Sequence, residues 1–346
     1  MLFSTLAEYF EKLEGTSSRL ALIDILVDLF KEVKASEVAQ VSYLLQGRVA
    51  PFYEATEIGM SEKLVAQAMA RAYGVEREKV LRDFGELGDL GIVAARLSEK
   101  LKVKSSKLTV NEVFETLRGI AKLSGEGTVE KKIKLLAGLL EKMDGISAKH
   151  LVRVPLGASR LGIGDPTILD AFAKLKLGDR GKRGELEGAY NRVSDLGVIG
   201  EILWSKGLKG VQGLDVQVGR PIRSELAERL PSPEKVIEKM DRVNVQRKLD
   251  GFRVQIHKDG DQIRLFSRNL EETTTMFPEI IEGAKKQIKA KTVILDSEAI
   301  GFSPESGEFL PFQETTQRRR KYGIEEMAKK IPLKAFCFDI LYKNGK

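Results

Sequence analysis

The stretch "VQRKLDGFRVQI", residues 245–256, decides how the second half of the chain is interpreted. It places Lys248 two residues before Asp250, followed by Gly251 and Arg253. We expect Lys248 to end one strand and Arg253 to open the next, with a tight turn at Gly251 between them. A lysine held beside a permanent cation loses some of its preference for its own proton, which suits a nucleophilic amine. The alternative is a solvated lysine on a charged strand.

The residues around this stretch alternate with the period of a strand. Val, Ile and Phe alternate or cluster in "RVNVQRK", "FRVQIHKDGDQIRLFSR", "KTVILDSEAIGF" and "KAFCFDILYKNGK". The Asp-Gly pair in "KDGDQ" (258–262) predicts a hairpin turn. One helix is clear here, "FPEIIEGAKKQI" (277–288), with Pro278 near its start. We therefore predict an α+β domain over residues 236–346.

The first 214 residues follow the helical period instead. Leu6, Phe10 and Leu13 fall on one helical face, and further helical patterns occupy about 110–123, 128–143 and 185–204. Gly, Pro and charged residues then become frequent, so residues 215–235 are predicted to be a junction between domains. The sequence predicts an all-α domain over 1–214, followed by this junction.

Two segments of the helical part resemble each other. "IGMSEKLVAQAMA" (58–70) aligns without gaps to "LGIGDPTILDAFA" (161–173), and each is a glycine-containing turn that opens a helix. We expect Ser61 to cap the first helix and Gly74 to end it. The pattern indicates a weak internal duplication with a period of about 100 residues.

The second turn has features that suit contact with a nucleic-acid backbone. Helix N-termini attract phosphate, and glycines let the backbone approach another surface closely. A basic stretch, "KLKLGDRGKR" (174–183), follows this turn. Two capped helices with solvated charges are the alternative. The candidate DNA-contacting residues are Arg160, Gly162, Gly164, Thr167, Lys182 and Arg183.

Composition limits the class of protein further. The 346 residues carry a net charge of +7, which favours an anionic partner such as nucleic acid. Two histidines and the single Cys337 argue against a zinc site or a disulfide framework, while a metal bound by carboxylates stays open. We find no run of about 18 apolar residues and no signal peptide, so we expect no membrane partner and a cytoplasmic location.

Four motifs resemble, in order, the nucleotidyltransferase motifs of ATP-dependent DNA ligases. They are "RKLDGFR" (247–253), "FSRN" (266–269), "ILDSEAI" (294–300) and "FCFDILY" (336–342). In addition, "RLGIGDPTILDAFA", "AYNRVSDLGVIGEIL" and "GRPIRSELAERL" resemble the helical DNA-binding domain and junction of archaeal and eukaryal replicative ligases. The resemblance implies an all-α DNA-binding domain followed by an adenylation domain.

The resemblance also implies a role for each matching residue. Lys248 would attack the α-phosphate of ATP and become linked to AMP. Arg253 and Arg268 would contact the nucleotide and its phosphates, and Glu298 would hold the ribose and help to place Mg²⁺. The remaining implied contacts are Phe338, against the adenine, and Gln246, at a position where the family usually has glutamate.

Such an enzyme passes AMP to the 5′-phosphate of a nick, and the 3′-hydroxyl then displaces it. The implied partners are nicked duplex DNA and a sliding clamp, and the implied setting is replication, repair and recombination near the nucleoid of an archaeal-type cell. We expect a monomer. Neither a preference between ATP and ADP nor the arrangement of the domains follows from the sequence.

The family pattern continues past Lys346 with two lysine-containing motifs and an oligonucleotide-binding barrel. The resemblance therefore suggests a C-terminally truncated adenylation domain, which would not complete nick sealing alone. Two alternatives stay open. One is a non-catalytic DNA-binding fragment, and the other is a different nucleotidyltransferase, such as a capping enzyme, an RNA ligase or an NAD-dependent ligase.

Overall fold

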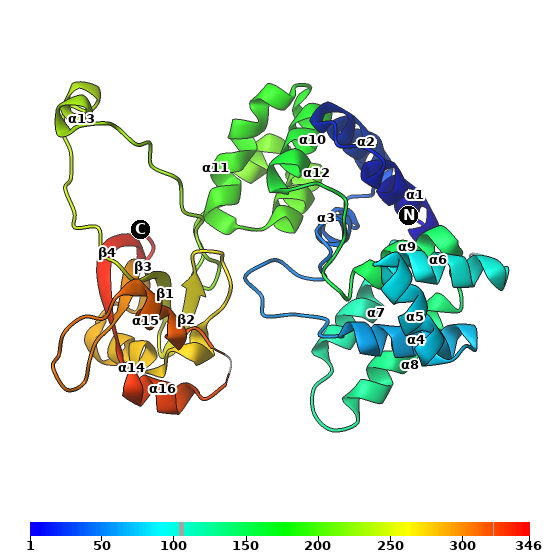
Figure 1. The fold of residues 1–346 in the computed structure, drawn as a ribbon. Helices are drawn as coiled ribbons and strands as arrows, with labels where there is room; N and C mark the ends of the chain where they lie inside the picture. The colour runs from blue at the N-terminus through cyan, green and yellow to red at the C-terminus, as the bar shows by residue number, and fades with distance from the viewer. Residues whose placement is uncertain (104–106, 321) are drawn as a thin grey trace. The chain divides into compact units, whose positions relative to one another are not determined.

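The computed structural model describes residues 1–103, 107–320 and 322–346. The chain divides into two compact units, a helical unit and a sheet unit (Figure 1). The helical unit comprises Met1–Pro51, Thr56–Tyr190 and Asp195–Leu214, and the sheet unit comprises Phe52–Ala55, Asn191–Ser194 and Asp215–Lys346. No helix among these described residues is long and apolar enough to span a membrane.

Helices account for nearly all regular structure before residue 214. They are α1 (Phe3–Glu14), α2 (Arg19–Glu32), α3 (Val38–Leu45), α4 (Glu62–Tyr73), α5 (Arg77–Leu87), α6 (Leu90–Lys100), α7 (Val110–Lys122), α8 (Thr128–Leu140), α9 (Gly145–Arg153), α10 (Asp165–Leu177), the 3₁₀ turn η1 (Arg180–Lys182), α11 (Arg183–Val193) and α12 (Leu196–Gln212).

The sequence pattern accounts for most of these boundaries. On α1, Leu6, Phe10 and Leu13 are buried on one face, as predicted. Helix α7 begins with a capping box, in which Thr109 and Glu112 satisfy each other's backbone N–H groups. Such an end fixes where the helix starts independently of its packing.

The single helix suggested over 185–204 is wrong, because two helices occupy that range. They separate at Ser194, whose φ of 53° does not fit a right-handed helix. Asp195 then caps α12 by accepting a hydrogen bond from the Val198 N–H at 3.1 Å. An apolar period that continues across a polar cap hides this break from a pattern-based prediction.

The proposed duplication is visible in the backbone. Gly59 and Gly162 occupy equivalent positions and both adopt left-handed φ, 63° and 65°. Helices α4 and α10 then start at equivalent residues, Glu62 and Asp165. Gly74 ends α4 in the left-handed conformation, as predicted. The Ser61 side chain, in contrast, makes no capping hydrogen bond.

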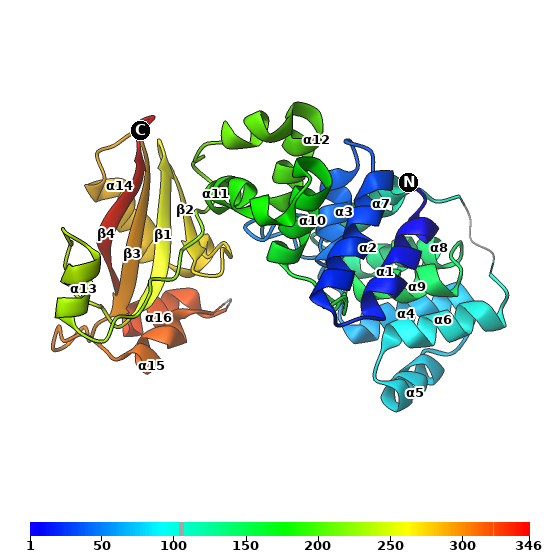
Figure 2. The same ribbon diagram turned by 90° about the horizontal axis from the view of Figure 1, so that it is seen from above.

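The sheet unit contains one antiparallel sheet of four strands in the order β2-β1-β3-β4 (Figure 2). The strands are β1 (Phe252–Asp259), β2 (Gln262–Ser267), β3 (Thr292–Gly301) and β4 (Leu333–Lys343). The other elements are α13 (Pro233–Lys239), η2 (Thr274–Met276), α14 (Pro278–Gln287), α15 (Phe312–Thr315), η3 (Thr316–Arg318) and α16 (Ile324–Lys330). The sequence predicted α14 alone among the helices, because α13, α15 and α16 are too short to establish a period.

The two faces of the sheet have different compositions. Phe252, Val254 and Ile256 of β1 belong to the apolar core, together with residues of α14. The alternate residues of β1, including Arg253 and Gln255, lie on the opposite face. We call this second side the polar face.

The strand expected at "RVNVQRK" is not formed. Lys248 lies in an extended segment outside the sheet, and the Val245 side chain on the same segment is 85% exposed. Both edges of β1 are already paired, with β2 and with β3, so this segment finds no free edge beside β1. The chain enters the sheet only at Phe252.

Candidate active site

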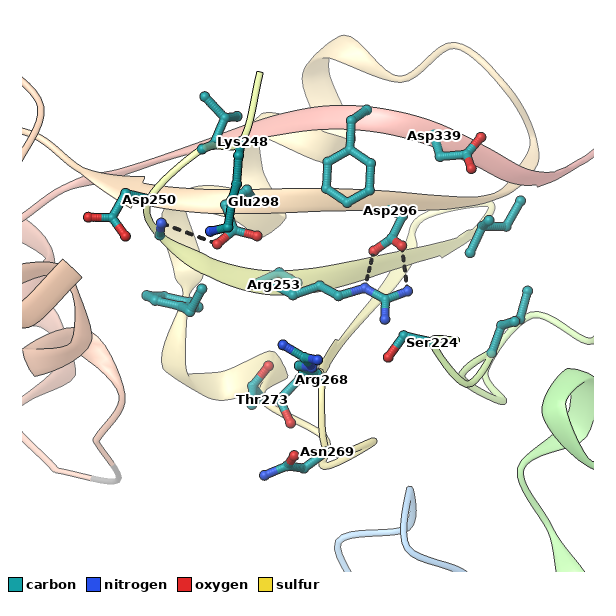
Figure 3. A pocket seen from close by; sticks show the side chains of 18 of the residues that line it. Ser224, Lys248, Asp250, Arg253, Arg268, Asn269, Thr273, Asp296, Glu298 and Asp339 are labelled. Atoms are coloured by element: carbon teal, nitrogen blue, oxygen red, sulfur yellow. Dashed lines mark hydrogen bonds and ion pairs between the residues drawn. The ribbon is translucent and has the colours of Figure 1, made fainter. Parts of the chain in front are cut away.

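A pocket of about 1000 Å³ opens on the polar face of the sheet (Figure 3). It brings together all six residues that the sequence implicated in nucleotide binding. They come from the segment before β1, from β1, from the end of β2, from β3 and from β4: Gln246, Lys248, Arg253, Arg268, Glu298 and Phe338.

Glu298 lies at the Lys248 end of this pocket. Its Oε1 accepts a hydrogen bond from the Gly251 N–H at 3.2 Å. Burial raises the pKa of Glu298 above its usual range, although this hydrogen bond and the Lys248 ammonium oppose the shift. A Cβ at Gly251 would lie 2.3 Å from the Ala299 carbonyl oxygen. Glycine is therefore required where the Lys248 segment joins β1.

Arg253 is bound to a carboxylate that the sequence analysis did not single out. Its Nε donates to Asp296 Oδ1 at 2.6 Å, and its Nη2 donates to Asp296 Oδ2. The charge of Arg253, which the sequence analysis set beside Lys248, is therefore neutralised by a buried partner. The spacing of Asp296 and Glu298, two residues apart on one strand, could have indicated that both carboxylates face the pocket.

Arg268 follows β2 and lines the same pocket. Neither Arg268 nor Lys248 forms an ion pair or a side-chain hydrogen bond with any part of the chain that the structure describes. Two uncommitted cations on one pocket wall attract anionic ligands. Sequence reasoning missed three further polar residues of this wall, namely Ser224, Asn269 and Thr273.

Gln246 and Phe338 are joined by a hydrogen bond, in which Gln246 Nε2 donates to the Phe338 carbonyl oxygen at 3.2 Å. This bond attaches the Lys248 segment to β4. The Phe338 side chain stays 40% exposed, so an aromatic face is open beside an amide group. Such a pair can receive a flat heterocycle by stacking and hydrogen bonding.

The six candidate DNA contacts do not form one group. Arg160, Gly162, Gly164 and Thr167 lie at the N-terminal end of α10, whereas Lys182 and Arg183 follow its C-terminal end. The 13 residues of α10 separate these two sets by roughly 20 Å.

The two arginines in these sets already have carboxylate partners. Arg160 pairs with Asp89 at 3.1 Å, and Arg183 pairs with Asp170 at 3.4 Å and Glu187 at 3.2 Å. These ion pairs leave less of the arginine charge for a phosphate group.

Among the described residues, one group of possible metal ligands lies close together, Glu11, Glu14 and His150. Lys149 Nζ lies 2.8 Å from Glu11 and 2.9 Å from Glu14, and Arg153 also binds Glu14. These acids are therefore neutralised by protein cations, and we assign no metal to them.

A helical unit followed by a small antiparallel sheet with a lysine- and arginine-lined pocket is consistent with a nucleotidyltransferase preceded by a helical domain. Comparison with known proteins is more specific. Residues 2–173 match the family described as DNA ligase N terminus, and residues 224–346 match the ATP dependent DNA ligase domain.

Curated relatives match along almost the whole chain. A probable DNA ligase of Dictyoglomus thermophilum is 47% identical, and the match covers 100% of this chain and 59% of the relative. DNA ligases of Saccharolobus solfataricus and Nitrosopumilus maritimus are 42% and 41% identical over 99% and 100% of this chain, and over 59% and 60% of the relatives. The chain thus spans about three fifths of their length. It belongs to the ATP-dependent DNA ligase family.

Proposed function

We propose that this chain carries the nucleotide site of a DNA ligase, in which Lys248 becomes covalently linked to AMP. The observation that supports this most is the grouping of Lys248, Glu298 and Arg268, which has no ion pair within the described ranges, around one pocket of a ligase-family chain. The reaction class is nucleotidyl transfer, with ATP as the cosubstrate.

In the proposed step, the Lys248 Nζ loses a proton to solvent and attacks the α-phosphorus of ATP. A P–N bond forms, the P–O bond to pyrophosphate breaks, and pyrophosphate leaves with the bonding electrons. Negative charge grows on the phosphate oxygens, and arginines of the lining such as Arg268 and Arg247 would stabilise it. Arg253, oriented by Asp296, and Glu298 would face the ribose, while Phe338 and Gln246 would receive the adenine.

Mg²⁺ fits this site as an ion held largely by the substrate. Glu298 is a carboxylate of the pocket open to it, as are Asp250 and Asp339, whereas Arg253 engages Asp296. Mg²⁺ typically uses one or two carboxylates together with phosphate oxygens and water. When bound, it would supply further charge neutralisation at the phosphates.

We further propose that the helical unit, residues 1–214, holds duplex DNA through its backbone, with residues 215–235 as the junction to the adenylation domain. AMP would pass from Lys248 to the 5′-phosphate of a nick before the 3′-hydroxyl closes it. Roles in replication, repair, recombination and cell division, a nucleoid location, a sliding-clamp partner and a monomeric state rest on resemblance to the family alone.

Labelling with ATP tests the covalent step. The chain, or a longer protein that contains it, is incubated with ATP labelled at the α-phosphate and with Mg²⁺, then denatured and separated on a gel. We expect label in the unaltered protein and none in Lys248→Ala. The control is Lys289→Ala, an exposed lysine outside the pocket, which should label normally. Label that persists in Lys248→Ala would remove Lys248 from its proposed role.

A further inference from the structure

Residues 219–225, which we call the strap, cross the polar face of β1 before the chain reaches Lys248. The strap forms no strand, yet its backbone is held in place. Its last four residues, Ile222–Glu225, line the pocket. In Figure 3, Ser224 lies towards the Arg253–Asp296 end and Lys248 towards the other end.

The Gln255 side chain pairs with the backbone of the strap as a neighbouring strand would. Its Oε1 accepts the Ile222 N–H at 2.7 Å, and its Nε2 donates to the Ile222 carbonyl oxygen at 3.1 Å. Gln255 is 3% exposed. One side chain therefore satisfies both backbone groups of one strap residue in a buried position, where an unmet hydrogen bond is unfavourable.

His257 holds the start of the strap. Its Nδ1 accepts the Gly219 N–H at 2.9 Å, so the proton lies on Nε2, which donates to Gln255 Oε1 at 2.9 Å. The imidazole is 1% exposed and packs edge-on against Phe266, with ring centroids 4.8 Å apart. Arg264 also donates to the Gly219 carbonyl oxygen at 3.0 Å, and further along the strap the Arg223 N–H donates to the Asn191 carbonyl oxygen at 2.8 Å.

Arg253, Gln255 and His257 alternate along one strand, so they share the polar face. Arg253 lines the pocket, and the next two residues of this row hold the strap. The hydrogen-bonding atoms of Gln255 and His257 are thus engaged with the strap and with each other. Neither residue lines the pocket, so direct contact with a ligand is not their task.

We propose that Gln255 and His257 are positioning residues that fix the strap as the end wall of the nucleotide pocket. The proposal rests on the proposed function, because it assigns the wall to an ATP site. Releasing the strap would let Ser224 move away from the Arg253–Asp296 pair. A pocket with a mobile wall binds more weakly because binding must then order it.

Four variants test this role. Gln255→Met keeps the shape of the side chain but removes its hydrogen bonds, and His257→Phe keeps the ring but removes the acceptor. His257→Asn is the conservative change, because the amide oxygen of asparagine can take the place of Nδ1. Ile256→Val is the matched control: it weakens the core on the opposite face of the same strand and leaves the strap contacts intact.

The first measurement is amide hydrogen exchange of residues 219–225, and the second is the dissociation constant for ATP by calorimetry. We expect Gln255→Met and His257→Phe to speed exchange of the strap about 10- to 100-fold and to weaken ATP binding about 10-fold. His257→Asn should restore much of both. Ile256→Val should lower the melting temperature without changing either measurement.

Unchanged strap exchange in Gln255→Met and His257→Phe would overturn the proposal. Faster exchange with unchanged ATP affinity would do the same, since the strap would then not serve the pocket. If Gln255→Met fails to fold, the His257 pair decides the question. A complete lack of ATP binding by the unaltered chain would overturn the proposed function and the positioning role with it. Slow amide exchange of residues 219–225 in that same chain would show that the strap is ordered and that the proposed nucleotide site is what fails.

Discussion

In the helical unit, Arg153 is buried between the carboxylates of Asp89 and Glu14, whereas in the sheet unit Lys248 and Arg268 face a pocket without an ion pair among the described residues. The Arg153 contacts measure 2.6 Å to Asp89 and 2.8 Å to Glu14. These carboxylates and cations neutralise one another across α1, α6 and α9. Lys248 and Arg268 are not neutralised in this way, although Arg253 in the same pocket pairs with Asp296.

The difference separates two uses of charge. A buried pair with complete partners fixes the arrangement of helices, and removing one partner leaves an uncompensated charge. A cation left without a partner in a pocket is unfavourable for folding alone but ready for an anionic ligand. The charges of Arg153 and its partners therefore stabilise the fold, while the charges of Lys248 and Arg268 are suited to binding a ligand.

The largest effect on stability should come from removing Arg153 from its buried ion pairs with Asp89 and Glu14. Arg153→Met leaves Asp89 and Glu14 without their main partner, and we expect a loss of about 3–5 kcal/mol in the free energy of unfolding. Urea denaturation followed by circular dichroism measures it. The matched control is Arg71→Met, which removes the exposed pair with Glu130 and should change stability by less than about 1 kcal/mol. Equal effects of the two substitutions would contradict the comparison.

A second prediction concerns acid pH and the sheet unit. Burial and the nearby Arg264 lower the pKa of His257 to about 3, so the folded protein keeps it neutral while the unfolded chain takes up a proton below about pH 6.5. The contribution of His257 to the free energy of unfolding should fall by about 1.4 kcal/mol per pH unit as the pH drops from roughly 6.5 to 3. Above this window the contribution should stay constant.

Comparing denaturation of the unaltered chain and of His257→Asn across pH 7.5 to 5 isolates this contribution. Subtraction is needed because burial also lowers the pKa of His150, which acts in the same direction. The carboxylate of Glu14, with its pKa near 2, adds a loss only below about pH 4.5. Identical pH slopes in the two proteins would show that His257 is not kept neutral by the fold.

A third, smaller effect should follow from changing the partner of Arg253. Asp296→Asn removes the charge that orients the guanidinium, and we expect ATP binding to weaken about 10-fold, or about 1.4 kcal/mol. Calorimetric titration measures the change. Asp261→Asn, at the exposed turn between β1 and β2, should leave the affinity as it was. Tighter binding in Asp296→Asn would mean that Asp296 opposes the nucleotide instead of supporting its site.

The smallest effect concerns DNA. Lys182 has no ion pair among the described residues, whereas Lys174 pairs with Asp24 at 2.5 Å. Lys182→Ala should weaken binding to duplex DNA only a few-fold and lower the slope of log affinity against log salt by about 1. Lys174→Ala is the control and should have less effect. Fluorescence anisotropy at several salt concentrations provides both numbers, and an unchanged slope for Lys182→Ala would exclude it from phosphate contact.

Local patterns in the sequence predicted much of the sheet unit. The alternation of β1 and β3 and the hairpin at 258–262 follow from residue types alone. The residues that the family resemblance implicated line one pocket, because β1, β3, β4, the residue after β2 and the segment before β1 meet there. The resemblance to ligases agrees with the family that the comparisons establish.

Contacts between side chains that lie far apart in the sequence could not be predicted from local patterns. Nothing near Arg253 in the sequence shows that Asp296 will bind it, and nothing near Gln255 shows that it will hold Ile222. The pairing of Arg160 with Asp89 is similarly distant in the chain. In each case a side chain finds its partner only once the fold exists, so the assignment needs coordinates.

The strap also changes how the chain between it and β1 behaves as a polymer. Residues 223–251 form a loop whose two ends are attached to the same strand, at Ile222 through Gln255 and at Phe252 by the strand itself. Doubling the length of such a loop raises the free-energy cost of closing it by only about 0.6 kcal/mol. Lys248 lies near the C-terminal end of this loop, three residues before Gly251. The reach of the lysine is therefore set by this attachment and by the Gln246 bond to β4, and the length of the loop before Gln246 can vary with little effect.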